Sequence, residues 1–430
     1  MTAPAPAADS TLAADLLKAI PEGWEALRAG AVEALRRQDL PTKREEDWKY
    51  LDLSALRQAA FRPAAPAAVD IRERILPEAR GTRLVFVNGR FDPHHSCTSA
   101  LPQGLRCLPL HAASEAAPRL GSLLEPAGSD FFANLNTAAF SEGAFVFVPK
   151  GIRADAPLHL LFLSVGGEGI LPVTLPRIFI EVERGASLEL LEEYAGTGAY
   201  LTSTAVEILV HEGAELRHER VQRESPEAYH VSSLRADVAK DARYLSRTIS
   251  FGAKLSRQTP QVRLLGPGAE ASLDGLALLN GKQVADTHSV MDHTVPHGTS
   301  RQLHKCIVDD EAQAVFNGRV FVRPEAQQTD AQQQCRTLLL SEKATVDAKP
   351  QLEIDADDVK CSHGAAVGAL DPEELFYLAS RGLDPVAARN LLTYGFASDL
   401  LARIPVASLR RALRQQVMAR TNASDLVETP

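Results

Sequence analysis

The segments VERGASLELL (residues 182–191) and ILVHEGAEL (residues 208–216) each place a Gly-Ala pair between two runs of strand-forming residues. Turns in which a small or charged residue precedes alanine recur at Gly185-Ala186, Gly213-Ala214, Asp241-Ala242 and Gly268-Ala269. The steps between these turns are 28, 28 and 27 residues. Strand–turn units that repeat at this length are typical of a solenoid, in which each coil buries its face against the next. The alternative is an accidental repeat, because Gly-Ala is a common pair.

The rest of the central sequence agrees with a solenoid. Similar turns follow at Glu311-Ala312 and Lys343-Ala344, with longer spacing. Short runs rich in β-branched and aromatic residues favour strands, and they lie at residues 144–148, 158–165, 177–182, 188–191 and 206–210. Asn88-Gly89 predicts a tight turn, and Asn317-Gly318 repeats the same pair. Because turns of this hairpin type are too few for a sandwich, we predict a mainly β protein with a parallel β-helix core.

Helical periodicity marks the N-terminal region. Leu27, Ala31 and Leu35 recur at four-residue steps, which predicts an amphipathic helix over residues 24–38 that Pro41 ends. A second helical segment is expected over residues 44–58, and the Ala/Pro-rich residues 61–68 are expected to form a linker.

The same periodicity returns after Gly368. Asp371-Pro372 and Asp384-Pro385 each supply an N-cap and a first helical residue, and these two helices are expected to end near Gly382 and Gly395. Residues 408–419 predict a third helix with a basic outer face. We therefore expect an N-terminal helical region at residues 1–80, a β-helix core at 81–368 and a C-terminal helical domain at 369–430, which would serve as a docking surface.

Composition narrows the class of protein. The chain has 430 residues, a net charge of −9 and a pI of about 5.8, which argues against nucleic acid or an anionic membrane as the main partner. The N-terminal sequence lacks the features of a signal peptide, and the longest apolar runs of the chain, such as residues 158–165, are too short for a transmembrane helix. Five cysteines do not make a disulfide framework, so we expect a cytoplasmic protein.

The stretch LEIDADDVKCSHGAAVG (residues 352–368) carries the candidate ligands. Its alternating pattern predicts a strand, and Asp357-Asp358 interrupts the pattern, so we expect a bulge or corner there. In an extended strand Cys361 and His363 point the same way, roughly 7 Å apart. A thiolate and an imidazole together suit iron or zinc. Two ligands do not complete a site, so the others would come from elsewhere, such as a second chain. The alternative is that Cys361 is a small core residue and His363 an ordinary core or surface side chain.

Other motifs are weaker. The chain has no phosphate-binding P-loop, and Gly266-Pro267-Gly268 opens strand-like sequence, so we expect this chain to bind no nucleotide. Four histidines and a cysteine gather within 19 residues and suggest a metal-handling surface: His288, His293, His297, His304 and Cys306. Their spacing matches no standard ligand set, so polar strand edges and turns are the favoured interpretation. The glutamines at 327–328 and 332–334 are interpreted as a solvated ladder along stacked coils.

Several long segments resemble the SufB/SufD family of iron–sulfur cluster assembly proteins. They are ADDVKCSHGAAVGALDPEELFYLASRG (356–382), NGRVFVRPEAQQTDAQQQCRTLLLS (317–341), KPQLEI (349–354) and REEDWKYLDLSAL (44–56). The chain length and the REEDWKY segment look more like SufD than SufB, and a Cys-x-x-Cys motif found near the N-terminus of many SufB proteins is absent.

The resemblance implies a right-handed parallel β-helix between helical regions. It implies a heterodimer with a SufB-like subunit through the β-helix, and docking of a SufC-like ATPase on the C-terminal helices. His363, with Cys361 beside it, matches the position at which SufD proteins contribute to a transient iron or iron–sulfur site shared with SufB. The chain would then be a non-catalytic subunit that supports iron entry and cluster assembly.

Three alternatives stay open at this point. The first is a carbohydrate-active enzyme on a β-helix, which the absent signal peptide and the 6% aromatic content disfavour. The second is a purely structural interaction subunit with no metal role. The third concerns the partner, because an isolated chain could form a homodimer instead.

Overall fold

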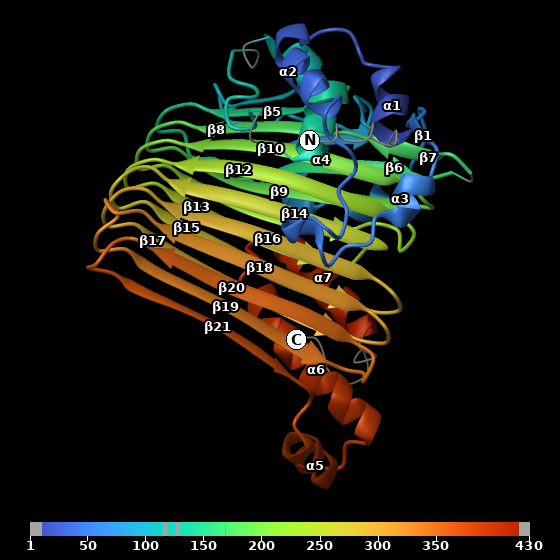
Figure 1. Cartoon of the computed structure of the whole chain (residues 1–430), viewed down its shortest axis with the longest axis vertical. Coiled ribbons are helices and arrows are strands. Elements are labelled where there is room, and N and C mark those ends of the chain that lie inside the picture. The colour runs from blue at the N-terminus through green and yellow to red at the C-terminus, as the bar shows by residue number, and fades with distance from the viewer. Residues whose placement is uncertain (1–10, 115–117, 126–129, 168, 421–430) are drawn as a thin grey trace, which may run out of the picture.

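The computed structural model describes residues 11–114, 118–125, 130–167 and 169–420. Two long parallel sheets run through the molecule, with helices at both chain ends (Figure 1). The α-helices are α1 (Thr11–Leu17), α2 (Glu25–Leu35), α3 (Ser54–Gln58), α4 (Phe131–Ala139), α5 (Pro372–Ser380), α6 (Pro385–Ala402) and α7 (Ala407–Arg420). Residues 1–10 and 421–430, which fall in the two predicted helical regions, lie outside the described residues.

Most strands before the C-terminal helices belong to the solenoid. The early strands are β1 (Phe61–Pro63), β2 (Arg83–Val87), β3 (Arg90–Phe91), β4 (Arg106–Pro109), β5 (Gly143–Val148), β6 (Leu158–Val165), β7 (Leu171–Thr174), β8 (Arg177–Val182), β9 (Ser187–Thr197) and β10 (Leu201–Val210). They continue as β11 (Glu215–Arg223), β12 (Tyr229–Val238), β13 (Arg243–Ser250), β14 (Leu255–Leu264), β15 (Glu270–Leu279), β16 (Val284–His293), β17 (Thr299–Val308), β18 (Gln313–Val322), β19 (Asp330–Leu339), β20 (Thr345–Ile354) and β21 (Lys360–Gly368).

From β8 onward, consecutive strands alternate between the two sheets. The main path of the first sheet runs β20-β18-β16-β14-β12-β10-β8-β5-β4, and the second runs β21-β19-β17-β15-β13-β11-β9-β6-β2-β3. Neighbours from β5 to β20 and from β6 to β21 are parallel, so each pair of consecutive strands forms one coil of a solenoid. The predicted parallel β-helix is confirmed, with about seven turns.

The repeated turns have the geometry that their sequence suggests. Gly185, Gly213, Asp241 and Gly268 have φ angles of 66°, 65°, 54° and 73°. This left-handed backbone suits glycine, and aspartate tolerates it better than most residues. The alanine after each turn residue is buried, because the chain bends there against the next coil. The small-residue repeat is therefore a steric requirement of the corner.

Helices cover the outer face of each sheet. On the first sheet, α1, α2 and α4 pack with outward residues such as Leu201 and Val231 in one apolar cluster. On the second sheet, α6 and α7 pack against outward residues such as Ile249 and Ile307. Among the described helices, none is long and apolar enough to cross a membrane.

Three local expectations were wrong. The predicted linker contains β1, in which Phe61 is buried and pairs with Leu171 of β7. Asn317-Gly318 lies inside β18 and forms no turn. Gly318 is needed there for close packing, because an added Cβ would lie 2.3 Å from the Gln333 side chain. Gly395 lies within α6, which continues to Ala402.

Other local expectations were right. Asn88 and Gly89 have φ angles of 50° and 70° between the antiparallel strands β2 and β3, so the predicted tight turn is confirmed. Asp371 caps α5 by accepting a hydrogen bond from Glu373 N, and Asp384 caps α6 in the same way.

Candidate functional site

The last coil of the solenoid is open. β20 and β21 end the strand orders of the two sheets, so no described strand pairs with their outer edges. The corner between them spans residues 355–359 and contains Asp357 and Asp358, as predicted. Asp358 N donates to Gln327 Oε1 at 2.9 Å, which ties the corner to the previous coil. An unpaired edge of this kind is a ready template for another strand.

Cys361 and His363 lie on the same side of β21. Cys361 pairs in register with Ala331 of β19 and His363 with Gln333, and both of these β19 residues are buried on the inner face of the solenoid. Side chains alternate along a strand, so Cys361 and His363 face the interior of the open coil. The predicted same-face arrangement is confirmed.

The two side chains differ in burial. Cys361 is partly buried and packs against the main core, whereas His363 is exposed. Burial raises the pKa of the Cys361 thiol, although a hydrogen bond to the backbone of Ala331 opposes the shift, and the Asp330 carboxylate raises the pKa further. Because the thiolate is the form that binds metal, an incoming cation must displace a proton from Cys361.

Apolar side chains surround this pair at the open end. The inner face of β20 carries Val346, Ala348, Pro350 and Leu352, which pair with inward residues of β18. Val367 of β21 is 49% exposed and Ile354 of β20 is 40% exposed. An apolar end face with two unpaired strand edges has the chemistry of a surface that another protein covers.

A second uncovered surface lies on α5. This helix has no buried residue and projects beyond the open coil (Figure 1). Phe376 is 76% exposed and Tyr377 is 56% exposed. Beside them lies a cavity of about 410 Å³. It is lined mainly by Leu339, Leu340, Leu370, Leu375, Phe376 and Arg389.

The histidine group of residues 288–304 does not form one site. His288 lies 3.1 Å from Asp286, and His293 bonds Ser300 at 2.8 Å inside the solenoid. The ring of His304 packs against that of Phe316 with a centroid distance of 4.4 Å and a tilt of 34°. His297 lies in a turn with a φ of 62°. The expectation of polar strand edges and turns is right for His297 alone. It was wrong for His288, His293 and His304, which are buried within β16 and β17, where His293 and His304 fill the interior of the solenoid.

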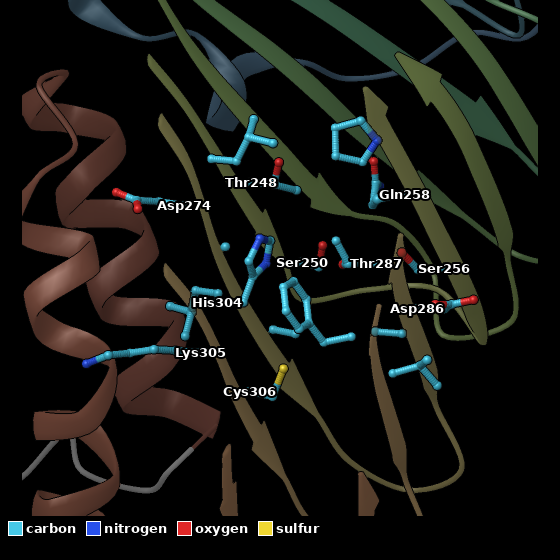
Figure 2. A pocket seen from close by; sticks show the side chains of 18 of the residues that line it. Thr248, Ser250, Ser256, Gln258, Asp274, Asp286, Thr287, His304, Lys305 and Cys306 are labelled. Atoms are coloured by element: carbon cyan, nitrogen blue, oxygen red, sulfur yellow. The ribbon is translucent and has the colours of Figure 1, made fainter. Parts of the chain in front are cut away.

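His304 and Cys306 instead line an interior cavity (Figure 2). The cavity has a volume of about 30 Å³, enough for one or two water molecules, and its walls include Ser250, Ser256 and Gln258. Burial lowers the pKa of His304 to about 4 and raises that of the Cys306 thiol. Both groups are neutral near pH 7, and the Cys306 thiol is unreactive.

Sequence reasoning missed a buried ionic network further along the same interior. Glu192 bonds His218 at 2.9 Å and Arg220 at 2.9 Å, and all three are almost fully buried. Burial opposes ionisation of Glu192, but Arg220 and His218 outweigh it and lower its pKa. The sequence repeat could have predicted this contact. Glu192 and Arg220 are 28 residues apart, the length of one coil, and therefore lie side by side on adjacent strands.

The fold and this end face define a parallel β-solenoid protein whose last coil is open and carries a thiol and an imidazole. A family model described as "SUF system FeS cluster assembly, SufBD core domain" matches residues 163–396, and one described as "SufBD protein N-terminal region" matches residues 13–160. The chain belongs to the SufBD family.

Individual relatives are similar in sequence over almost the whole chain. An iron-sulfur cluster assembly SufBD family protein of Synechocystis is 40% identical over 412 residues, which is 92% of this chain and 90% of the relative. Iron-sulfur cluster assembly protein SufD of Escherichia coli is 33% identical over 401 residues, 90% of each chain. Protein ABCI7, chloroplastic, of Arabidopsis thaliana is 33% identical over 409 residues, 91% of this chain and 85% of the relative.

Proposed function

We propose that this chain is a SufD-type subunit of an assembly complex with a SufB-like and a SufC-like protein. It supports iron acquisition and iron–sulfur cluster assembly at its interface with the SufB-like subunit. Family membership and the similarity to Escherichia coli SufD support this proposal. The chain performs no catalysis and binds no nucleotide itself; the SufC-like partner supplies the ATPase.

The observation that carries the proposal is the position of Cys361 and His363. Both face the interior of the open coil, and the His363 side chain makes no hydrogen bond or ion pair with any described residue. The pair offers one soft and one borderline ligand, which is half of a tetrahedral set. A partner that pairs with the edge of β21 would bring the remaining ligands to the same place. Iron or a cluster is cargo at this interface.

The C-terminal helices would couple the ATPase to this interface. Phe376 and Tyr377 of α5 provide an exposed apolar surface for the SufC-like partner. Helix α6 is tied to the second sheet, because Lys305 of β17 donates to Asp399 at 2.7 Å. β21 is the last strand of that same sheet. A displacement of α6 would therefore act on the sheet that holds Cys361 and His363.

A purely structural subunit is the second candidate. It is favoured by the partial burial of Cys361 and by the raised pKa of its thiol, which are typical of a packing cysteine. In that case the SufB-like partner would hold the cluster alone, and this chain would only close the end of the solenoid.

Anaerobic co-expression with the two partners separates these candidates. Complexes carrying wild-type chain, His363→Ala or Cys361→Ser are compared by light scattering for composition and by visible absorption for cluster. His94→Ala is the matched control, because His94 is also exposed but lies far along the chain from the open coil. Intact complexes that lose cluster absorption only with the two site variants support the assembly role. Intact complexes with full absorption assign a structural role to this chain.

A further inference from the structure

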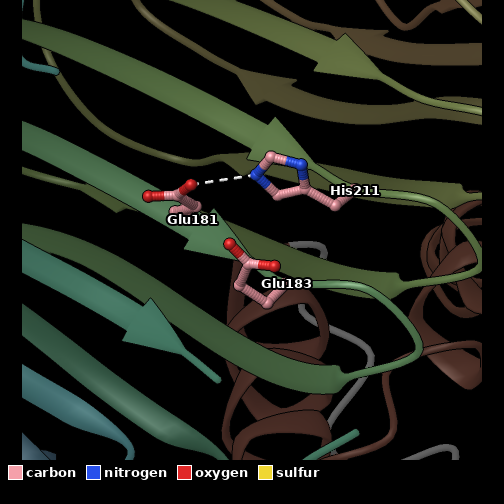
Figure 3. Close-up of side chains that lie close together, drawn as sticks. All are labelled: Glu181, Glu183 and His211. Atoms are coloured by element: carbon pink, nitrogen blue, oxygen red, sulfur yellow. Dashed lines mark hydrogen bonds and ion pairs between the residues drawn. The ribbon is translucent and has the colours of Figure 1, made fainter. Parts of the chain in front are cut away.

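A second group of ligand-type side chains lies at a corner of the solenoid. Glu181 belongs to β8, and Glu183 directly follows that strand. His211 directly follows β10, which pairs with β8 in parallel so that Val182 lies opposite Val210. Glu183 and His211 are 28 residues apart, the length of one coil, and therefore stack side by side. Figure 3 shows the three side chains converging at the ends of these strands.

The spacing of their atoms suits a metal ion. His211 Nε2 lies 2.9 Å from Glu181 Oε1. One ligand atom from each of Glu181, Glu183 and His211 lies within 4.8 Å of the other two. Zinc binds nitrogen and oxygen ligands at about 2.1 Å, so adjacent ligands in its tetrahedral geometry stand about 3.4 Å apart. The hydrogen-bonded His211–Glu181 pair is close to that separation, and a Glu183 oxygen lies within 4.8 Å of both ligand atoms.

Burial and a neighbouring arginine fix one of the ligands. The Glu181 side chain is 5% exposed, and Arg119 donates a hydrogen bond to its Oε2. That contact leaves Oε1 directed at His211. Ligating carboxylates in metal sites are commonly held by such an outer hydrogen bond. His211 is 40% exposed, so an ion can reach the group from solvent.

The group is specific to this corner. One coil further on, Leu209 takes the place of Glu181 and Ala239 that of His211. The charged residues that follow along this edge, such as Asp237 and Arg263, form acid–arginine ion pairs and include no histidine. Among the described residues, this is the one place where three histidine, cysteine or carboxylate side chains come together as potential ligands. His95, by contrast, has a single carboxylate partner, Asp92, at 2.7 Å.

We propose that Glu181, Glu183 and His211 bind a divalent first-row metal ion. One imidazole nitrogen and carboxylate oxygens suit Zn²⁺, Co²⁺, Fe²⁺ or Mn²⁺, and the absence of sulfur from the set disfavours a cluster or Cu⁺. Three protein ligands leave positions for water. This site is separate from Cys361 and His363 and does not depend on their role.

The test uses the full chain with Cys361→Ser and His363→Ala, so that the open coil contributes no ligands. Zn²⁺ is titrated by calorimetry and Co²⁺ by visible absorption, at neutral pH and without chelating buffer. We expect one equivalent to bind, and we expect His211→Ala and Glu183→Gln each to weaken binding at least about tenfold. His95→Ala is the matched control and should bind as the parent does.

Two results would overturn the proposal. One is the absence of saturable binding up to about millimolar Zn²⁺, well above the range expected of a protein site. The other is equal affinity of the parent and both site variants. Glu183→Gln keeps the shape of a partly exposed side chain, so it remains a valid test should His211→Ala fold poorly. Circular dichroism melting of each variant verifies the fold.

Discussion

Replacing Phe376 by alanine should abolish tight binding of the proposed SufC-like partner and leave this chain's own stability unchanged. The α5 helix that carries Phe376 has no buried residue, so its side chains contribute little to the folded chain. Substitutions at such exposed positions usually change the free energy of unfolding by less than about 0.5 kcal/mol. The substitution is therefore expected to lower the affinity for the partner and not the stability of the free chain.

The size of the loss follows from the exposed area. A phenylalanine buries about 200 Å² when it is fully covered, and 76% of Phe376 is exposed, which leaves about 150 Å² for a partner to cover. At about 25 cal/mol per Å² this is at most about 4 kcal/mol. Ordering of side chains at the interface reduces it, so we expect about 2–4 kcal/mol, or roughly 30- to 1000-fold in Kd.

Calorimetry with the purified SufC-like partner measures this change, and circular dichroism melting measures the stability of the free chain. Leu265→Ala is the control, because Leu265 is 43% exposed but lies between β14 and β15, away from α5. Phe376 is not the docking residue if Phe376→Ala binds within about threefold of wild type, and it is part of the folded core if its variant melts well below Leu265→Ala; either result contradicts the prediction.

Three further changes test the packing and the buried charges of the solenoid. Burial raises the pKa of Glu219 to about 8 even though Arg247 lies 3.1 Å away, so the folded chain binds a proton that the unfolded chain releases above its lower pKa. Protonated Glu219 stabilises the folded chain at low pH, and this stabilisation is lost as the pH rises toward 8. In melting experiments the free energy of unfolding of Glu219→Gln should therefore exceed that of wild type by a margin that grows between about pH 5 and pH 8, by up to about 1.4 kcal/mol per pH unit. Ala242→Leu, at a fully buried corner, should cost about 1–3 kcal/mol in chemical denaturation through overpacking, and an unchanged midpoint would contradict the corner geometry. Arg177→Met leaves the buried Glu207 without its ion-pair partner and should cost about 3–5 kcal/mol in the same assay, whereas a neutral result would mean that Glu207 finds another partner.

The sequence allowed the solenoid to be predicted because the corner places a steric demand on every coil. A left-handed residue followed by a buried alanine appears wherever β8, β10, β12 and β14 end, and that pair is visible as a repeat of 27 to 28 residues. The predicted turn at Asn317-Gly318 was wrong because this pair favours a turn only when nothing else constrains it. In β18 the glycine makes room for the Gln333 side chain. Local turn chemistry cannot reveal a contact with the next coil.

One candidate site could be predicted from local sequence, and the other depends on contacts between coils. Cys361 and His363 lie two residues apart on one strand, so strand geometry alone was enough to place them on one face. Glu183 and His211 come together only through the stacking of coils, and their separation of one coil length was the available signal. Local sequence patterns did not predict how far individual side chains are buried. Glu192 lies in the interior and His363 is exposed, and neither could be read from neighbouring residues.

Hydrogen exchange of the peptide covering β21 tests most directly whether the open coil is the surface that the SufB-like subunit covers. Exchange would be measured for the free chain, at a dilution where light scattering shows a monomer, and for the complex. We expect residues 360–368 to exchange rapidly in the free chain and to become strongly protected in the complex, while β15, which is paired on both sides, stays unchanged. Equal exchange of β21 in both states would show that the SufB-like subunit does not cover the open coil, because the edge that carries Cys361 and His363 would then remain open to solvent.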